Sequence, residues 1–236
     1  MKNNFYQLTN QDENNAELYI YGDITSYKWY EDEVCAYDMA KELAQLGEKD
    51  LSVRINSYGG EVAQGLAIYN LLKNYKGTVT TLCDGFACSA ASVIFMAGTE
   101  RKMPRSSLLM IHNAWTYAAG DSNALRKAAD DIEKITQPSV EIYKSCSSLS
   151  EEQIKEMMDR EEWITADEAH SYGFATEIVE DTVKQSLHDG ILAKLVLKNK
   201  ELEKQLNNTQ PLQKKGWFFK LVLRQEKVPV KLKYFI

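Results

Sequence analysis

The sequence lacks any long apolar run, any paired-cysteine motif and any apolar segment near its start. No stretch approaches the ~18 apolar residues that a membrane-spanning helix needs. The polar opening MKNNFYQLTNQDENN has no hydrophobic core of the kind found in signal peptides. The cysteines form no C-x-x-C pair, which argues against a zinc site and a disulfide framework: Cys35, Cys83, Cys88 and Cys146. We therefore expect a reduced, cytoplasmic protein that does not bind membranes.

Composition and charge divide the chain into two parts. Its 236 residues, 44% hydrophobic and 26% charged, suffice for one sizeable α/β domain with an appendage. Residues 184–236 hold 12 Lys and Arg against 4 Asp and Glu, a balance of +8, whereas the rest of the chain holds 16 against 30. This change of sign predicts a domain at 1–183 and a basic C-terminal tail at 184–236, partly helical or disordered.

The basic tail raises the question of nucleic-acid contact. Four cations lie among aromatic residues near its end: Lys214, Lys215, Lys220 and Arg224. No nucleic-acid-binding fold motif accompanies them. We therefore interpret the tail as an assembly arm and expect no nucleic-acid partner.

The acidic part alternates between strand and helix patterns. Apolar and β-branched runs predict strands at 18–21, 51–55, 79–83, 101–103 and 108–111. Apolar residues at helical spacing, several closed by glycine, predict helices at 30–46, 62–75, 90–97, 124–145 and 151–158. Such alternation indicates a layered α/β fold with right-handed crossovers.

Three junctions between these elements stand out, although each alone has an ordinary explanation. INSYGGEV, at 55–62, joins a strand to a helix through two glycines, which fits a tight turn or a ligand-facing backbone. GFACSAASV, at 85–93, surrounds Ser89 with small side chains, where a serine at a helix start is more often a cap than a nucleophile. SLLMIHNAW, at 107–115, ends a strand at His112, which alone would read as a partly buried structural histidine.

Two well-known motifs are absent at these junctions. No Lys-Ser or Lys-Thr follows Gly59 and Gly60, so a Walker-type phosphate loop is not expected. The serine segment is not G-x-S-x-G, so the signature of α/β-hydrolases is missing.

Taken in order with REEWITADEAHSYGFATEI at 160–178, the three junctions resemble the ClpP peptidase family (peptidase S14). The family equivalents are an N-S-P-G-G turn, a G-x-A-[small]-S nucleophile segment, an M-I-H-x-P histidine and a carboxylate just before an aromatic residue. The resemblance covers residues 17–180 and is closest to ClpP-like proteases of phages and prophages, some of which act in head maturation. It implies a ClpP/crotonase-like layered fold of repeated strand-strand-helix units, with a protruding handle helix in 120–143.

The resemblance also implies a set of site residues. Ser89 matches the nucleophile and His112 the general base, and the N–H groups of Gly60 and Ala90 match the oxyanion donors. Glu161 falls at the third position, where aspartate is usual, with Asp159 and Glu162 as neighbouring alternatives. Tyr58 replaces the proline of the glycine turn, at a residue whose side chain the chemistry does not need. The resemblance implies no cofactor and no metal.

The resemblance further implies hydrolysis of unfolded or accessible polypeptides inside a homo-oligomeric ring of six or seven subunits, single or stacked in pairs. Only about a dozen and a half polar residues precede the first predicted core strand, which argues against docking of a Clp-type ATPase. Two alternatives remain. Crotonase-type acyl-CoA enzymes share the backbone oxyanion hole but need no serine–histidine pair. A scaffold or assembly protein with an impaired site would explain the missing aspartate.

Overall fold

The structure, a computed structural model, describes residues 6–26 and 34–180. The tail predicted at 184–236 lies outside these residues. The strands are β1 Tyr6–Asn10, β2 Asn15–Ile20, β3 Asp50–Ser57, β4 Val79–Cys88, β5 Glu100–Pro104, β6 Leu108–Ile111, β7 Glu162–Thr165 and β8 Glu177–Val179. The helices are α1 Ala36–Leu46, α2 Val62–Lys73, α3 Ala90–Phe95, α4 Ser122–Ser145, α5 Glu151–Asp159 and α6 Ala166–Tyr172.

The strands form one sheet that branches at β4. The main path runs β1-β2-β3-β4-β5-β8, with β1 antiparallel to β2 and the remaining neighbours parallel. The first part of β4 pairs with β5 at residues 80–82, and its last part pairs with β6 at residues 86–88. On the other side of β6, β7 pairs antiparallel with it. The end of β4 therefore has a different neighbour from its beginning.

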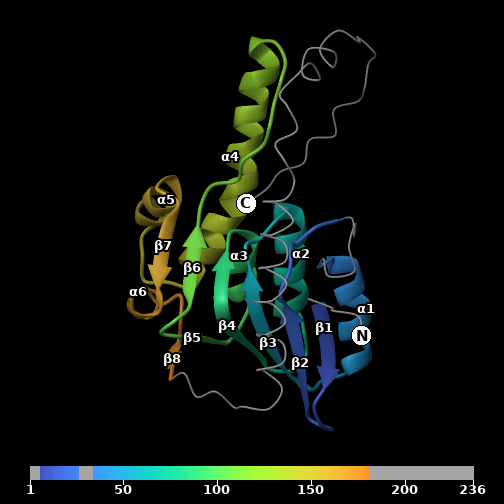
Figure 1. Cartoon of the computed structure of the whole chain (residues 1–236). Coiled ribbons are helices and arrows are strands. Elements are labelled where there is room, and N and C mark those ends of the chain that lie inside the picture. The colour runs from blue at the N-terminus through green and yellow to red at the C-terminus, as the bar shows by residue number, and fades with distance from the viewer. Residues whose placement is uncertain (1–5, 27–33, 181–236) are drawn as a thin grey trace, which may run out of the picture. The chain divides into compact units, whose positions relative to one another are not determined.

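Alternating burial along the strands explains how the sheet acquires a core face. In β3 every second side chain is buried, including Leu51, Val53 and Ile55, and these face helices α2 and α3 (Figure 1). Glycine lets these two helices approach closely, because a Cβ on Gly65 of α2 would lie 2.9 Å from the Cβ of Ala90 in α3. The predicted layered α/β fold class is confirmed.

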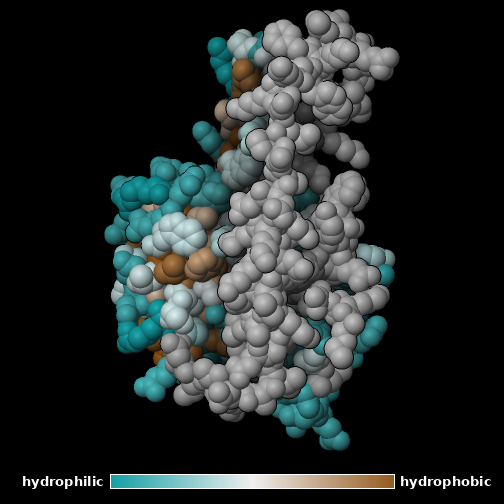
Figure 2. Space-filling view, viewed as in Figure 1, coloured by the Kyte–Doolittle hydropathy of each residue, from teal (hydrophilic) through white to brown (hydrophobic). Residues whose placement is uncertain are grey.

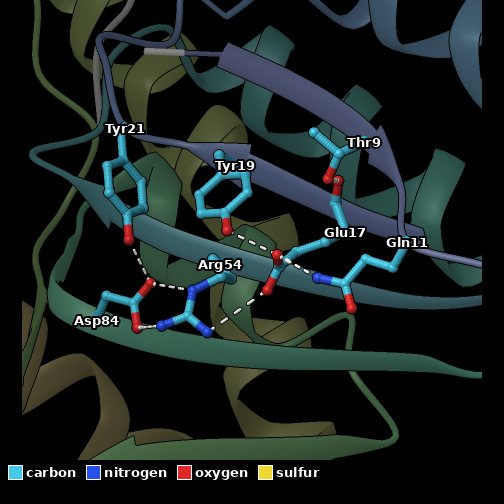
Figure 3. Close-up of polar contacts among 7 residues, drawn as sticks. All are labelled: Thr9, Gln11, Glu17, Tyr19, Tyr21, Arg54 and Asp84. Atoms are coloured by element: carbon cyan, nitrogen blue, oxygen red, sulfur yellow. Dashed lines mark hydrogen bonds and ion pairs between the residues drawn. The ribbon is translucent and has the colours of Figure 1, made fainter. Parts of the chain in front are cut away.

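A polar network occupies the opposite face of β2, β3 and β4 (Figure 3). The guanidinium of Arg54 donates to Asp84, with Nε 2.8 Å from Oδ2, and it also lies 3.5 Å from Glu17. The hydroxyl of Tyr19 donates to Glu17 and that of Tyr21 donates to Asp84. Burial and then the Asp84 carboxylate raise the pKa of Tyr21, so its phenol stays protonated as a donor. These bonds cross three strands and favour one register of the sheet.

Helix α4 is the predicted protruding helix. It begins at the N-cap Asp121, whose carboxylate accepts from the N–H groups of Asn123 and Ala124, and its first turns extend beyond the sheet (Figure 1). Its C-terminal half packs on the core through a fully buried Tyr143 and Val140. One end of the helix is thus anchored while the other projects.

Several predicted elements need correction. The opening residues were expected to be only a polar lead, yet residues 6–10 form β1, which turns into β2 where Asp12 accepts from the N–H groups of Asn14 and Asn15. The helix predicted from residue 30 begins at Ala36, because Val34 forms a β-bridge with Ile24; residues 30–33 lie outside the described part. The strand predicted to end at Cys83 continues to Cys88, and β7, α6 and β8 were not predicted.

Most other elements agree with the sequence. Strand β6 has the predicted bounds, and α5 begins at the predicted Glu151 after a capping box of Ser150 with Gln153. The unpredicted α6 also begins at a capping box, formed by Thr165 with Glu168. Within the described ranges, no helix has both the length and the apolar character needed to cross a membrane.

Candidate active site

An irregularity between β3 and β4 directs β4 toward the candidate site. The Cα register shifts from Ile55 opposite Cys83 to Ser57 opposite Ala87, so β4 holds two extra residues there. The side chain of Asn56 fills the gap, and its Oδ1 accepts from the N–H of Phe86 at 3.1 Å. A Cβ on Gly85 would lie 2.7 Å from that oxygen. Bulges of this kind re-aim a strand, and here the strand leads to Ser89.

The glycine turn after β3 is held directly against this strand end. The hydroxyl of Ser57 accepts from the N–H of Gly59 at 3.0 Å and donates to the carbonyl of Gly22 at 2.7 Å. Gly59 and Gly60 have φ values of +100° and +149°, which favour glycine. A Cβ on Gly59 would lie 2.6 Å from the Cβ of Ser89 and 2.9 Å from the N of Ala90. The turn and the serine segment are therefore in backbone contact.

Ser89 lies on a sharp turn between β4 and α3. Its φ of +59° and ψ of −128° are unusual for any residue other than glycine. The small neighbours Ala87, Cys88, Ala90 and Ala91 are all fully buried. Close backbone packing thus accounts for the small residues. Ser89 itself is only 2% exposed.

His112 is brought to Ser89 by the pairing of β4 with β6. The register sets Cys88 beside Met110, and the N–H of Ser89 donates to the carbonyl of Met110 at 2.8 Å. His112 follows the end of β6, and its Nε2 lies 2.8 Å from the Oγ of Ser89. The two residues are 23 positions apart in sequence, but adjacent strand ends place them within hydrogen-bond distance.

The electrostatic setting favours a neutral imidazole. Burial lowers the pKa of His112, and the negative charge of Glu161 acts in the opposite direction. A neutral ring whose Nε2 accepts from the serine hydroxyl must carry its proton on Nδ1. Such a ring can act as a base at neutral pH.

Among the three carboxylates considered for the third position, Glu161 is the one whose charge acts on His112. It has a left-handed φ of +50° and is exposed, and no hydrogen bond joins it to the imidazole in the described structure. Asp159 instead accepts from Nδ2 of Asn113 at 2.7 Å, and Glu162 pairs with Arg160. The three side chains thus have three different partners.

The two expected oxyanion donors are available. Within residues 6–26 and 34–180, neither the N–H of Gly60 nor that of Ala90 has a hydrogen-bond acceptor. Ile24 bonds to both sides of Gly60, donating to Gly59 and accepting from Glu61, and so fixes the orientation of the turn. Two backbone donors beside a serine can stabilise negative charge on a substrate oxygen.

Other nucleophiles near the site are already engaged or unreactive. The hydroxyl of Ser92 is fully buried and donates to the carbonyl of Ser89 at 2.6 Å, with Tyr143 as a second partner at 2.8 Å. Burial raises the pKa of Cys88 to about 12, so its thiol stays protonated. In the described ranges, no three His, Cys, Asp or Glu side chains are grouped so that they could hold a metal ion.

Aromatic side chains border the site on the face of the sheet opposite α2 and α3. Tyr58, 68% exposed, packs edge-on against Phe86, and Phe86 packs edge-on against Trp163, with ring centroids 5.5 Å apart in both pairs. Figure 2 shows apolar side chains gathered on this face over β6 and β7. Tyr58 therefore joins the glycine turn to this aromatic row.

Three supporting residues were not foreseen from the sequence: Asn56, Ser57 and Asn113. Polar residues at strand ends next to glycine or histidine were the available signal. Their hydrogen bonds shape the backbone around Ser89 and His112.

The branched sheet and the projecting helix define the class as α/β proteins with a ClpP/crotonase-like fold, and known proteins agree. The description of the Clp protease family matches residues 5–182. ATP-dependent Clp protease proteolytic subunits are similar: that of Deinococcus radiodurans is 33% identical over 142 residues, 59% of this chain and 69% of the relative. That of Porphyromonas gingivalis is 37% identical over 139 residues, 58% of this chain and 62% of the relative.

A solved structure agrees in fold. A point mutant of ClpP1 from Listeria monocytogenes is 27% identical with a TM-score of 0.59, covering 72% of this chain and 93% of that one. The chain spans less than two thirds of the Porphyromonas relative and of that from Bacteroides fragilis, where it covers 64%. The chain belongs to the Clp protease family.

Proposed function

We propose that the chain is a serine endopeptidase that hydrolyses unfolded or accessible polypeptides. The observation that carries the proposal is the 2.8 Å contact between Oγ of Ser89 and Nε2 of His112. It lies at a sharp turn beside two backbone N–H groups that have no acceptor among the described residues. Family membership supports the same activity. Acyl-CoA chemistry of the crotonase type would leave this serine–histidine contact without a role.

The proposed reaction follows from the placement of these groups. Nε2 of His112 takes the hydroxyl proton while Oγ of Ser89 forms a bond to the scissile carbonyl carbon. The N–H groups of Gly60 and Ala90 hold the negative oxygen that results. The protonated imidazole gives its proton to the leaving amine as the C–N bond breaks. Water then hydrolyses the acyl-enzyme by the same proton transfers in reverse order.

Changing Glu161 to glutamine should lower turnover and shift the pH profile. The carboxylate raises the pKa of His112, so its removal lowers that pKa and moves the acidic limb of kcat/KM to lower pH. We expect kcat to fall roughly a hundredfold, less than the ~10⁴-fold loss for a buried triad aspartate, because Glu161 is exposed. A pH–rate profile with a short fluorogenic peptide measures both effects.

Glu162→Gln is the matched control for this change, since Glu162 is adjacent but pairs with Arg160. It should leave the acidic limb unmoved. If Glu161→Gln also leaves both kcat and the limb unmoved, the site works as a Ser89–His112 dyad.

We extend the proposal to assembly and biological role. Family resemblance supports a ring of six or seven subunits, single or stacked, with the catalytic residues inside a chamber. The projecting end of α4 supports contact between subunits. The basic residues 184–236 are proposed as a separate assembly arm, and the likeness to phage members points to head maturation as the role.

Native mass spectrometry of the full chain should therefore show a ring oligomer at micromolar concentration. Removing the projecting turns of α4, by deletion of 119–127, should reduce the assembly to smaller species. A clean monomer of the unmodified chain would contradict the chamber.

An impaired scaffold is the second candidate. The observation that favours it is the lack of a hydrogen bond between Glu161 and His112 in the described structure. Hydrolysis of the fluorogenic peptide by the unmodified chain, abolished by an active-site serine reagent, would exclude it.

A further inference from the structure

A hydrogen bond next to His112 has no part in the reaction described above. Nδ2 of Asn113 donates to Oδ1 of Asp159 at 2.7 Å. Asn113 directly follows His112, and Asp159 ends α5, two residues before Glu161. The bond therefore ties the segment that carries the imidazole to the segment that carries the carboxylate.

The pairing of β6 with β7 explains why this tie matters. The last pair of the ladder on the side of the site is Ile111 with Glu162. One further step in the same register would set His112 opposite Glu161. The left-handed φ of Glu161 ends the ladder at this step. Beyond His112 and Glu161, the side-chain hydrogen bond between Asn113 and Asp159 joins the two segments a second time.

The two segments are otherwise held unequally. The chain after His112 is fixed to α4, because the N–H of Ala114 donates to Oγ1 of the buried Thr136 at 3.2 Å. On the other side, Glu161 has an exposed side chain, and its N–H donates to the carbonyl of Met158 at 3.1 Å. The Glu161 turn is thus held beside the histidine segment by the last ladder pair on one side and, on the other side, by the bond between Asn113 and the end of α5.

We propose that Asn113 and Asp159 are positioning residues whose hydrogen bond holds the Glu161 turn beside His112. This rests on the proposed function, in which Glu161 acts on the imidazole. Asp159 serves as a hydrogen-bond acceptor for Asn113, and its negative charge is not required at the imidazole.

The kinetics of four variants and one control variant test this assignment. Asn113→Ala and Asp159→Ala should each lower kcat about five- to tenfold, the equivalent of one lost hydrogen bond, with KM unchanged. The double variant should be no worse than either single one. Asp159→Asn retains an acceptor oxygen and should restore most of the turnover. Asp167→Ala, which removes a comparably exposed bond to Arg105, is the control and should match the unmodified protein.

A second measurement separates positioning from general damage. In a Glu161→Gln background, Asn113→Ala should cost less than twofold, because the carboxylate that it places is already gone. Histidine NMR titration in a Ser89→Ala background should show a lower pKa for His112 after Asn113→Ala, since the Glu161 charge moves away. The chain has three histidines, so the resonance can be assigned by comparison with His112→Ala.

The outcomes distinguish this proposal from the proposed function. If the protein is active but Asn113→Ala changes neither kcat nor the pKa of His112, the positioning role alone is overturned. A loss with Asp159→Asn as large as with Asp159→Ala also overturns it, because the charge would then act directly. An inactive protein whose His112 titration still responds to Asn113→Ala overturns the proposed function and supports the positioning role.

Discussion

Replacing Ser89 with alanine is expected to abolish peptide hydrolysis and leave the fold intact. The hydroxyl is the only atom lost, and the turn already accommodates a Cβ at this position. In serine proteases, mutation of the nucleophilic serine lowers kcat by about 10⁶-fold. His112→Ala should be equally inactive, and the double variant no worse, because the two act as one unit. Peptide turnover, with circular dichroism as the check on folding, measures the result.

Ser92→Ala is the matched control for this experiment. Ser92 is three residues away and fully buried, and its hydroxyl bonds to Ser89 and Tyr143. Its loss should cost about 1 kcal/mol of stability but keep turnover within an order of magnitude. Wild-type turnover in Ser89→Ala would exclude Ser89 as the nucleophile.

Replacing Gly59 with alanine is expected to cost about 10²–10³-fold in kcat, comparable to the loss of an oxyanion donor. The new Cβ would lie 2.6 Å from the Cβ of Ser89 and 2.7 Å from the carbonyl oxygen of Cys88. Since these neighbours are a short side chain and backbone, the turn has to move away from Ser89, and the N–H of Gly60 moves with it. A peptide hydrolysis assay measures the loss of kcat, and a thermal melt measures the loss of stability caused by the displaced turn.

Gly47→Ala separates this clash from backbone strain. Gly47 also has a positive φ, +73°, but a Cβ there would meet nothing within 4 Å. This variant should lose some stability and retain full kcat. Equal kcat losses in the two variants would show that the contact between the glycine turn and Ser89 is unimportant.

The sequence predicted the central fold well where burial is periodic. The strands around 51–55 and 108–111 and the long helix near 124–145 carry strong patterns that tertiary packing reinforces. The sequence-based prediction failed for strands that are stabilised mainly by pairing with a neighbouring strand. Residues 7–9 of β1 are exposed or only partly buried, and this strand pairs with β2 alone, as β7 pairs with β6 alone, in the described part of the chain. Such strands have weak patterns of their own.

The candidate site was predicted from ordered motifs, and its geometry needed the structure. The segment lacks the G-x-S-x-G signature, yet Ser89 has a positive φ, with Ala87 and Ala91 at the positions of those glycines. The contact of Ser89 with His112 depends on the register of β4 with β6, which no local pattern reveals. The bond between Asn113 and Asp159 joins residues 46 positions apart and was equally inaccessible.

The backbone conformation of Ser89 lowers the stability of the fold at the residue that we propose as the nucleophile. A non-glycine residue at φ +59° and ψ −128° costs on the order of 1–3 kcal/mol, a sizeable part of the net stability of a domain. Glycine would relieve that cost, because it adopts positive φ without a steric penalty. A protein that served only as a scaffold would gain stability from replacing Ser89 with glycine and would lose no function. Under the proposed function, catalysis supplies the reason for keeping a serine in this costly backbone conformation, whereas a purely structural role supplies none.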